Sequence, residues 1–158
     1  MKIKIIIMRR GVFSMSPEGN KALIRQMIEA FNERNLDLLG GLTAPDYVDR
    51  THNLHGLEET ENFIKMLIKS LDFHITVEDT IAEGDRVWAR LTFTGKHVGD
   101  FHGIAPTGEK FNEPAVQIFR VTNGKVAEVL QVSNEMDLMM KLGLIEYTEK
   151  ARKIQSGN

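Results

Sequence analysis

The sequence predicts an α+β domain: three helices followed by a curved, mostly antiparallel sheet around an internal pocket. Apolar residues recur at helical spacing up to about residue 71 and then alternate with polar ones, as in strands. Two tight turns, at 83–85 and at Asn123-Gly124, join the strands as hairpins. Because the helices are grouped before the strands, the order favours α+β over a βαβ arrangement.

Caps and turn residues mark the helices. Ser16 and Pro17 suit the N-cap and first position of the first helix. Asn35 suits the N-cap of a short second helix, which Gly40-Gly41 brings to an end. The third helix is predicted over 57–71.

Four long strands are predicted after these helices, and one short one before the third. The long strands cover 73–81, 87–94, 110–121 and 125–133, and the short extended segment covers 47–52. A short closing helix follows the last strand and ends near residue 143. Several strands carry apolar residues on both faces, so one face should pack on the helices and the other on a second layer or second subunit.

Length and composition narrow the class of protein. The 158 residues suit one domain, and a net charge of −2 without charged blocks gives no reason to expect nucleic acid or membrane as partner. The absence of cysteine excludes disulfides and thiolate chemistry and fits a cytoplasmic protein. We expect 1–14 to be a flexible leader or alternative start, 15–144 the domain, and 145–158 a polar C-terminal tail.

Several motifs, in this order, are typical of one family. They lie at Asn20–Arg25, Ala44–Asp49, Glu83–Val87, Gly99–Gly108 and Ile118–Glu128. Over residues 20–143 the chain resembles the SnoaL-like polyketide cyclase (ester cyclase) family of the nuclear-transport-factor-2-like superfamily. The resemblance implies a cone-shaped, cystatin-like roll with an internal pocket, usually a homodimer. It also implies an intramolecular aldol reaction on a polyketide ester without metal or organic cofactor.

One position departs from the family pattern. The family carries an acid/base aspartate near the end of the last strand, and Asn134 occupies that position here. Three functions therefore stay open for a small, largely apolar ligand. The first is a cyclase- or isomerase-type enzyme that removes a proton beside a carbonyl. The second is a binding protein that has lost the base. The third is an epoxide-hydrolase-like enzyme, for which Glu113 with Arg90 is the only candidate pair.

Glu113 and Asn134 are the candidate catalytic residues. A two-residue turn at Asn123-Gly124 predicts that residues whose numbers sum to 247 face each other, if no bulge intervenes. Glu113 would then face Asn134, and Gln117 would face Leu130. A buried glutamate has a raised pKa, as a general base needs. The alternatives are a solvated Glu113 and an Asn134 that caps the closing helix.

Other side chains are candidates for binding the substrate, and each also has a structural interpretation. His52 would donate or accept a hydrogen bond in the pocket, and Arg90 could hold an oxyanion or pair with Asp79. The remaining candidates follow from strand faces or core spacing: Met66, Trp88, Gln117, Phe119 and Leu130. The histidines at 52, 55, 97 and 102 lack the spacing of a zinc site, so no metal is expected.

Overall fold

The computed structural model describes residues 15–155, so the expected leader lies outside the described residues. The helices before the main sheet are α1 (Pro17–Asn32), α2 (Leu36–Leu42) and α3 (Gly56–Ser70). The Ser16 hydroxyl accepts a hydrogen bond from the Gly19 amide at 3.1 Å, and Asn35 Oδ1 accepts one from the Leu38 amide at 3.0 Å. Both predicted N-caps are therefore confirmed.

The sheet has six strands, and its order is β2-β1-β6-β5-β4-β3. The strands are β1 (Thr43–Asp49), β2 (Leu54–His55), β3 (Leu71–Glu83), β4 (Arg86–His97), β5 (Lys110–Thr122) and β6 (Lys125–Ser133). Only β1 and β6 pair in parallel among the described strands; the other neighbours are antiparallel. The α+β class and the mostly antiparallel sheet are thus confirmed, and the sheet is open rather than closed into a barrel.

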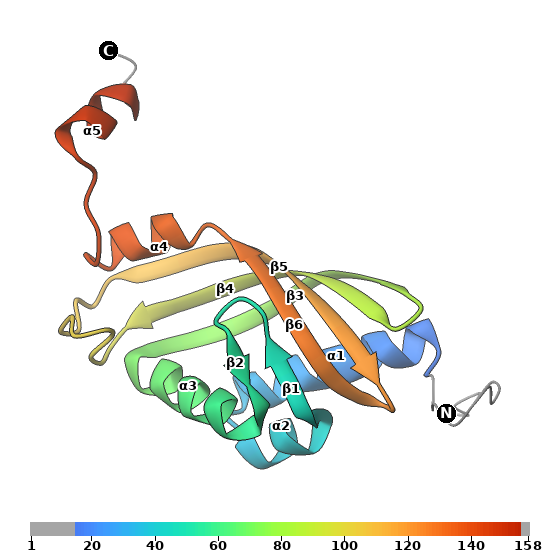
Figure 1. Ribbon diagram of the computed structural model, residues 1–158. Helices are drawn as coiled ribbons and strands as arrows, with labels where there is room; N and C mark the ends of the chain where they lie inside the picture. The colour runs from blue at the N-terminus through green and yellow to red at the C-terminus, as the bar shows by residue number, and fades with distance from the viewer. Residues whose placement is uncertain (1–14, 156–158) are drawn as a thin grey trace.

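Helices α1, α2 and α3 lie on one face of the curved sheet (Figure 1). Helix α1 packs against β3 and β4, and α3 packs against β1 and β3. Helix α4 (Glu135–Lys141) follows β6, and the expected polar tail contains a further helix, α5 (Glu149–Gln155), which stands away from the body in Figure 1. Among the described residues no helix is long and apolar enough to cross a membrane.

Strand β4 extends three residues beyond the predicted strand and includes Gly95. A Cβ at position 95 would lie 2.5 Å from the Asp72 carbonyl oxygen and 2.5 Å from Phe111 Cζ. Glycine therefore lets the Phe111 ring cross the strand at close range while the ladder with β3 continues to His97. The predicted strand ends at residue 94, just before this glycine, and the close packing around Gly95 accounts for the longer strand in the structure.

A β-bulge between Arg120 and Val121 overturns the predicted register of the last hairpin. Next to the turn, Val121 pairs with Val126, as predicted, but beyond the bulge Gln117 pairs with Gln131 and Phe119 with Val129. The extra residue shifts every later pair by one position. Because side chains alternate between faces, the shift turns Leu130 and Asn134 away from the predicted face and brings Gln131 and Ser133 onto it.

The core between helices and sheet is formed by aliphatic and aromatic residues of α1, β3, β4 and β5. Leu91 lies at the centre of β4 and has no exposed surface, whereas its neighbour Arg90 is exposed. We expect Leu91→Ala to lower the free energy of unfolding by about 2–5 kcal/mol, because the truncation leaves a cavity. Urea denaturation would measure this, with Arg90→Ala as a control that changes it by less than about 0.5 kcal/mol.

Candidate functional site

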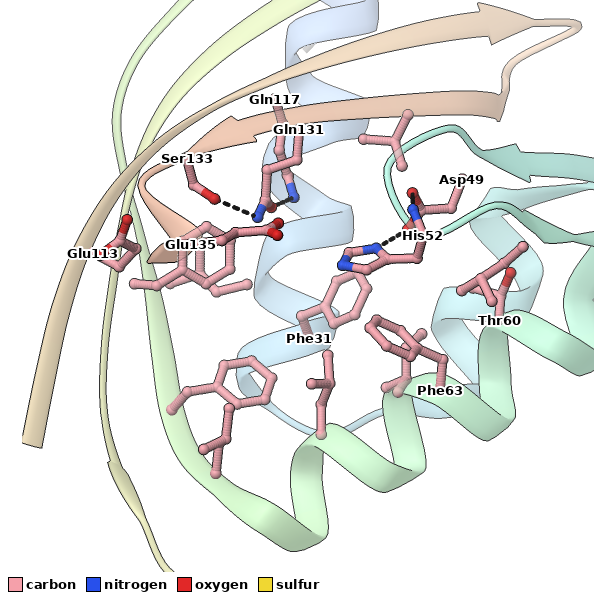
Figure 2. A pocket seen from close by; sticks show the side chains of 18 of the residues that line it. Phe31, Asp49, His52, Thr60, Phe63, Glu113, Gln117, Gln131, Ser133 and Glu135 are labelled. Carbon is pink, nitrogen blue, oxygen red and sulfur yellow. Dashed lines mark hydrogen bonds and ion pairs between the residues drawn. The ribbon is translucent and has the colours of Figure 1, made fainter. Parts of the chain in front are cut away.

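A pocket of about 430 Å³ lies between the sheet and helices α1, α3 and α4. Its volume is in the range of pockets that bind small organic molecules. Most of its wall is apolar, from Met27 and Phe31 on α1, Phe63 and Leu67 on α3, and Phe119 on β5. The polar side chains gather on β1, on the loop after it, on β5 and β6, and at the start of α4 (Figure 2).

Asp49 and His52 form a hydrogen-bonded pair where β1 ends. Nδ1 of His52 lies 2.9 Å from Oδ2 of Asp49, and Asp49 Oδ1 accepts the backbone amides of Thr51 and His52 at 2.8 and 3.1 Å. The ring of His52 also packs on Phe63, with 4.4 Å between ring centroids. Figure 2 shows the second ring nitrogen directed away from Asp49, into the pocket toward Glu135. Asp49 therefore fixes the orientation of the imidazole.

The pair changes the proton affinity of both groups. The hydrogen bond to Asp49 raises the pKa of His52; burial opposes the rise, and the negative charges of Asp49 and Glu135 add to it. Burial alone would raise the pKa of Asp49, but the hydrogen bonds from His52 and Thr51 outweigh burial and lower it. The imidazolium form of His52 is thus stabilised in the pocket.

Glu113 is the second ionisable group in the wall and comes from β5. Its side chain is 5% exposed, and Oε1 has no hydrogen-bond partner among the described residues. Burial raises the pKa of Glu113, and the nearby charges of Asp137 and Glu135 raise it further, while the Asn134 amide and Lys141 oppose the rise. Glu113 is therefore a buried carboxyl group and not the solvated residue of the alternative interpretation.

A row of polar side chains connects β5 and β6 along the pocket wall. The amide nitrogen of Gln117 donates to Gln131 Oε1 at 2.7 Å, and that of Gln131 donates to the Ser133 hydroxyl at 3.3 Å. Figure 2 shows this row between Glu113 and the His52–Asp49 pair. Such a row offers hydrogen bonds to ligand oxygens in an otherwise apolar pocket.

The structure places four of the predicted site residues in the pocket wall: His52, Glu113, Gln117 and Phe119. The side chain of Asn134 does not face Glu113 across the hairpin, as was predicted, because the bulge changes the register. Asn134 is exposed at the N-cap position of α4, and its side chain makes no capping hydrogen bond. Its backbone carbonyl instead accepts the Asp137 amide at 3.0 Å.

The other predicted binding residues lie outside the pocket wall. Trp88, Arg90 and Leu130 are on the outer face of the sheet, and Arg90 lies across from Asp79 on β3. The assignment of Trp88 and Arg90 to the pocket was wrong because the inward positions of β4 belong to its buried alanine and leucine side chains. Met66 packs against the core, but the α3 side chains that face the pocket are Thr60, Phe63, Ile64 and Leu67.

Sequence reasoning missed Asp49, Gln131, Ser133 and Glu135. An acidic residue three positions before His52, at the end of a strand, was the available signal for Asp49. The other three depend on the bulge, for which the sequence carries no glycine or other marker. Among the described residues no group of three or more histidine, aspartate and glutamate side chains could hold a metal ion.

An open α+β fold with an apolar pocket and ionisable groups in the pocket wall is typical of proteins that bind small molecules. The profile of the SnoaL-like polyketide cyclases matches residues 21–142, and the chain belongs to this family. The site thus lies in a pocket protein of the cyclase type.

Curated relatives and solved structures agree with this assignment. The aklanonic acid methyl ester cyclase AcmA of Streptomyces galilaeus is 29% identical over 111 residues, covering 66% of this chain and 77% of that protein. The nogalonic acid methyl ester cyclase of Streptomyces nogalater is 27% identical over 108 residues, covering 65% and 81%. The crystal structure of AclR from Streptomyces galilaeus, a candidate hydroxylase, is 29% identical with a TM-score of 0.76, covering 90% of this chain and 92% of AclR.

Proposed function

We propose that this protein is a cyclase-type enzyme that removes a proton beside a carbonyl group of a small, largely apolar substrate. One observation carries the proposal: two buried ionisable groups, Glu113 and Asp49 with its partner His52, face a single apolar cavity. A pocket that only bound an apolar ligand would have no need for a buried carboxyl group with one oxygen, Oε1 of Glu113, left without a hydrogen-bond partner among the described residues, because such a group costs stability.

Glu113 is suited to take the proton. Its raised pKa brings its basicity closer to neutral pH, where a general base is most effective. In its ionised form it accepts the proton from the carbon, and the electron pair moves to the carbonyl oxygen as an enolate. The enolate carbon then attacks a second carbonyl of the same substrate and closes the ring, and the resulting alkoxide is protonated.

His52 is suited to stabilise the negative charge on oxygen. Since Asp49 occupies Nδ1, Nε2 carries a proton only in the imidazolium form, which both carboxylates favour. That Nε2–H can donate to the developing enolate oxygen in a site largely shielded from water. Gln131 and Ser133 are positioned to bind other oxygens of the substrate.

The test follows from the relatives, two of which are named as cyclases of aklanonic acid methyl ester and nogalonic acid methyl ester. The full chain should be incubated with each ester in deuterium oxide, and the products followed by chromatography and NMR. We expect ring closure, or deuterium incorporation at the carbon beside the ester carbonyl, well above the protein-free rate. Binding of both esters with neither reaction would contradict the enzyme and favour the binding protein.

We also propose that the protein is a homodimer that pairs through the outer face of the sheet. Ile81, Trp88 and Leu130 form one apolar row across the strands, with Val116 and Val132 in the next, and Val132 is 62% exposed. We expect Val132→Glu to shift the mass measured by light scattering from dimer to monomer. Val98→Glu, in a loop, serves as the control. A monomeric wild-type protein at micromolar concentration would contradict this.

A further inference from the structure

The pocket wall is strongly unbalanced in charge. Asp49, Glu113 and Glu135 contribute three carboxyl groups, whereas none of the described residues that line the pocket is lysine or arginine. Lys141 acts on Glu113 from outside the wall, and it is already paired with Asp137. A ligand therefore meets carboxylates in the pocket and no permanent positive charge.

The imbalance persists in every protonation state of the site. In the state that the proposed reaction needs, with Glu113 ionised and His52 protonated, three carboxylates face one imidazolium. If His52 is protonated and Glu113 is neutral, Asp49 offsets His52, and Glu135 still leaves the wall negative. If His52 is neutral and Glu113 ionised, three negative charges remain. His102, the other histidine in the wall, and Glu135 are both exposed, so solvent weakens what either contributes to the field in the pocket. A carboxylate ligand is thus repelled in each case.

Two further features favour a positively charged ligand group. Glu113 lines the pocket, and its buried Oε1 has no hydrogen-bond donor among the described residues, so a cationic ligand group in the pocket would offset a charge that the protein leaves partly uncompensated. The wall also contains aromatic rings on several elements, among them Phe31, Phe63 and Phe119. The faces of such rings attract cations, most strongly where water is excluded.

We propose that the pocket accepts a ligand carrying a protonated amine and rejects a carboxylate of the same shape. This inference rests on the proposed pocket function and deepens it, since it adds amine-bearing aromatic molecules to the ligand class. Glu135, exposed at the rim, and Glu113, buried in the wall, supply the selectivity.

Three naphthalene probes that differ only in one substituent test the inference at pH 8 and low salt. They are 2-naphthylmethylamine, which is cationic, 2-naphthalenemethanol, which is neutral, and 2-naphthoate, which is anionic. Calorimetry with the full chain should show the amine binding at least tenfold more tightly than naphthoate, with the alcohol between them. An amine that does not bind, or a naphthoate that binds as tightly as the amine, would overturn the inference.

Charge-neutral variants locate the selectivity. Glu135→Gln and Glu113→Gln should each reduce the ratio of amine to naphthoate affinity at least threefold, whereas Glu83→Gln, an exposed glutamate outside the wall, should leave it unchanged. An unchanged ratio in both pocket variants would contradict the assignment. Deuterium incorporation into the ester substrates is measured separately. Its absence would count against the enzyme and not against the charge selectivity, and an absent selectivity would leave the enzyme intact.

Discussion

Replacing Glu113 with glutamine should lower turnover by about 100- to 10,000-fold, the usual range for loss of a general acid or base. Glutamine keeps the size of the side chain and cannot accept the proton at neutral pH. Deuterium incorporation beside the ester carbonyl should fall by the same factor as ring closure, because both depend on the same proton removal. Affinity for the ester should change little, since the amide can fill the same space.

The same variant should be more stable than the wild type at pH 8. Burial raises the pKa of Glu113 above its ordinary 4.5, so the folded protein loses stability as pH rises from 4.5 through the folded pKa. Glutamine removes that loss. A large drop in turnover with a rise in melting temperature at pH 8 would therefore separate a catalytic role from a structural one.

Glu83→Gln is the matched control for Glu113→Gln, because Glu83 is exposed at the end of β3 and does not line the pocket. It should change neither turnover nor melting temperature. Full activity of Glu113→Gln on an ester that the wild type cyclises would rule out Glu113 as the base.

Periodicity and turn residues suffice to predict most of this fold, because they act locally. The alternation of apolar residues and the Asn123-Gly124 turn correctly indicate the β3–β4 and β5–β6 hairpins. The bulge between Arg120 and Val121 depends on tertiary packing of β5 and β6 and not on local sequence. Its one extra residue changes which side chains of β6 face the pocket. The site was therefore harder to predict than the fold. The errors on the sheet trace to one register shift and to the outward face of β4, whereas Met66 and Asp49 were misjudged separately.

The position of Asn134 shows how the site differs from the family pattern without losing ionisable groups. An asparagine where the family has its acid/base aspartate suggests a lost activity when only the sequence is considered. In the structure the residue after it, Glu135, faces the pocket, and the carboxyl of Glu113 lies buried below the first turn of α4. Sequence comparison at one position thus says little about chemistry that several strands supply together.

Replacing Asp49 with asparagine should lower turnover by about 10- to 100-fold and move the alkaline limb of the pH–rate profile to lower pH. The wild-type profile should be bell-shaped, because the mechanism needs Glu113 ionised and His52 protonated. Asp49 raises the pKa of His52, mainly through their hydrogen bond. Without that carboxylate His52 loses its proton earlier as pH rises, and the enolate oxygen loses its donor.

Stability gives an independent measure of the Asp49–His52 pair. The lowered pKa of Asp49 contributes stability above its ordinary 3.8, which is lost as pH falls through the folded pKa. The raised pKa of His52 contributes stability that is complete below 6.5 and is lost as pH rises through the folded pKa. The difference in melting temperature between wild type and Asp49→Asn should therefore be largest between pH 3.8 and 6.5.

His52→Gln separates the charge of the imidazole from its hydrogen bond. Glutamine can still hydrogen-bond, but it carries no titrating proton, so the alkaline limb should disappear from the pH–rate profile rather than move. Arg90→Ala, on the outer face of β4, should leave the profile unchanged. An alkaline limb that persists at the same pH in both Asp49→Asn and His52→Gln would show that another group supplies the donor, and the role of His52 would be lost.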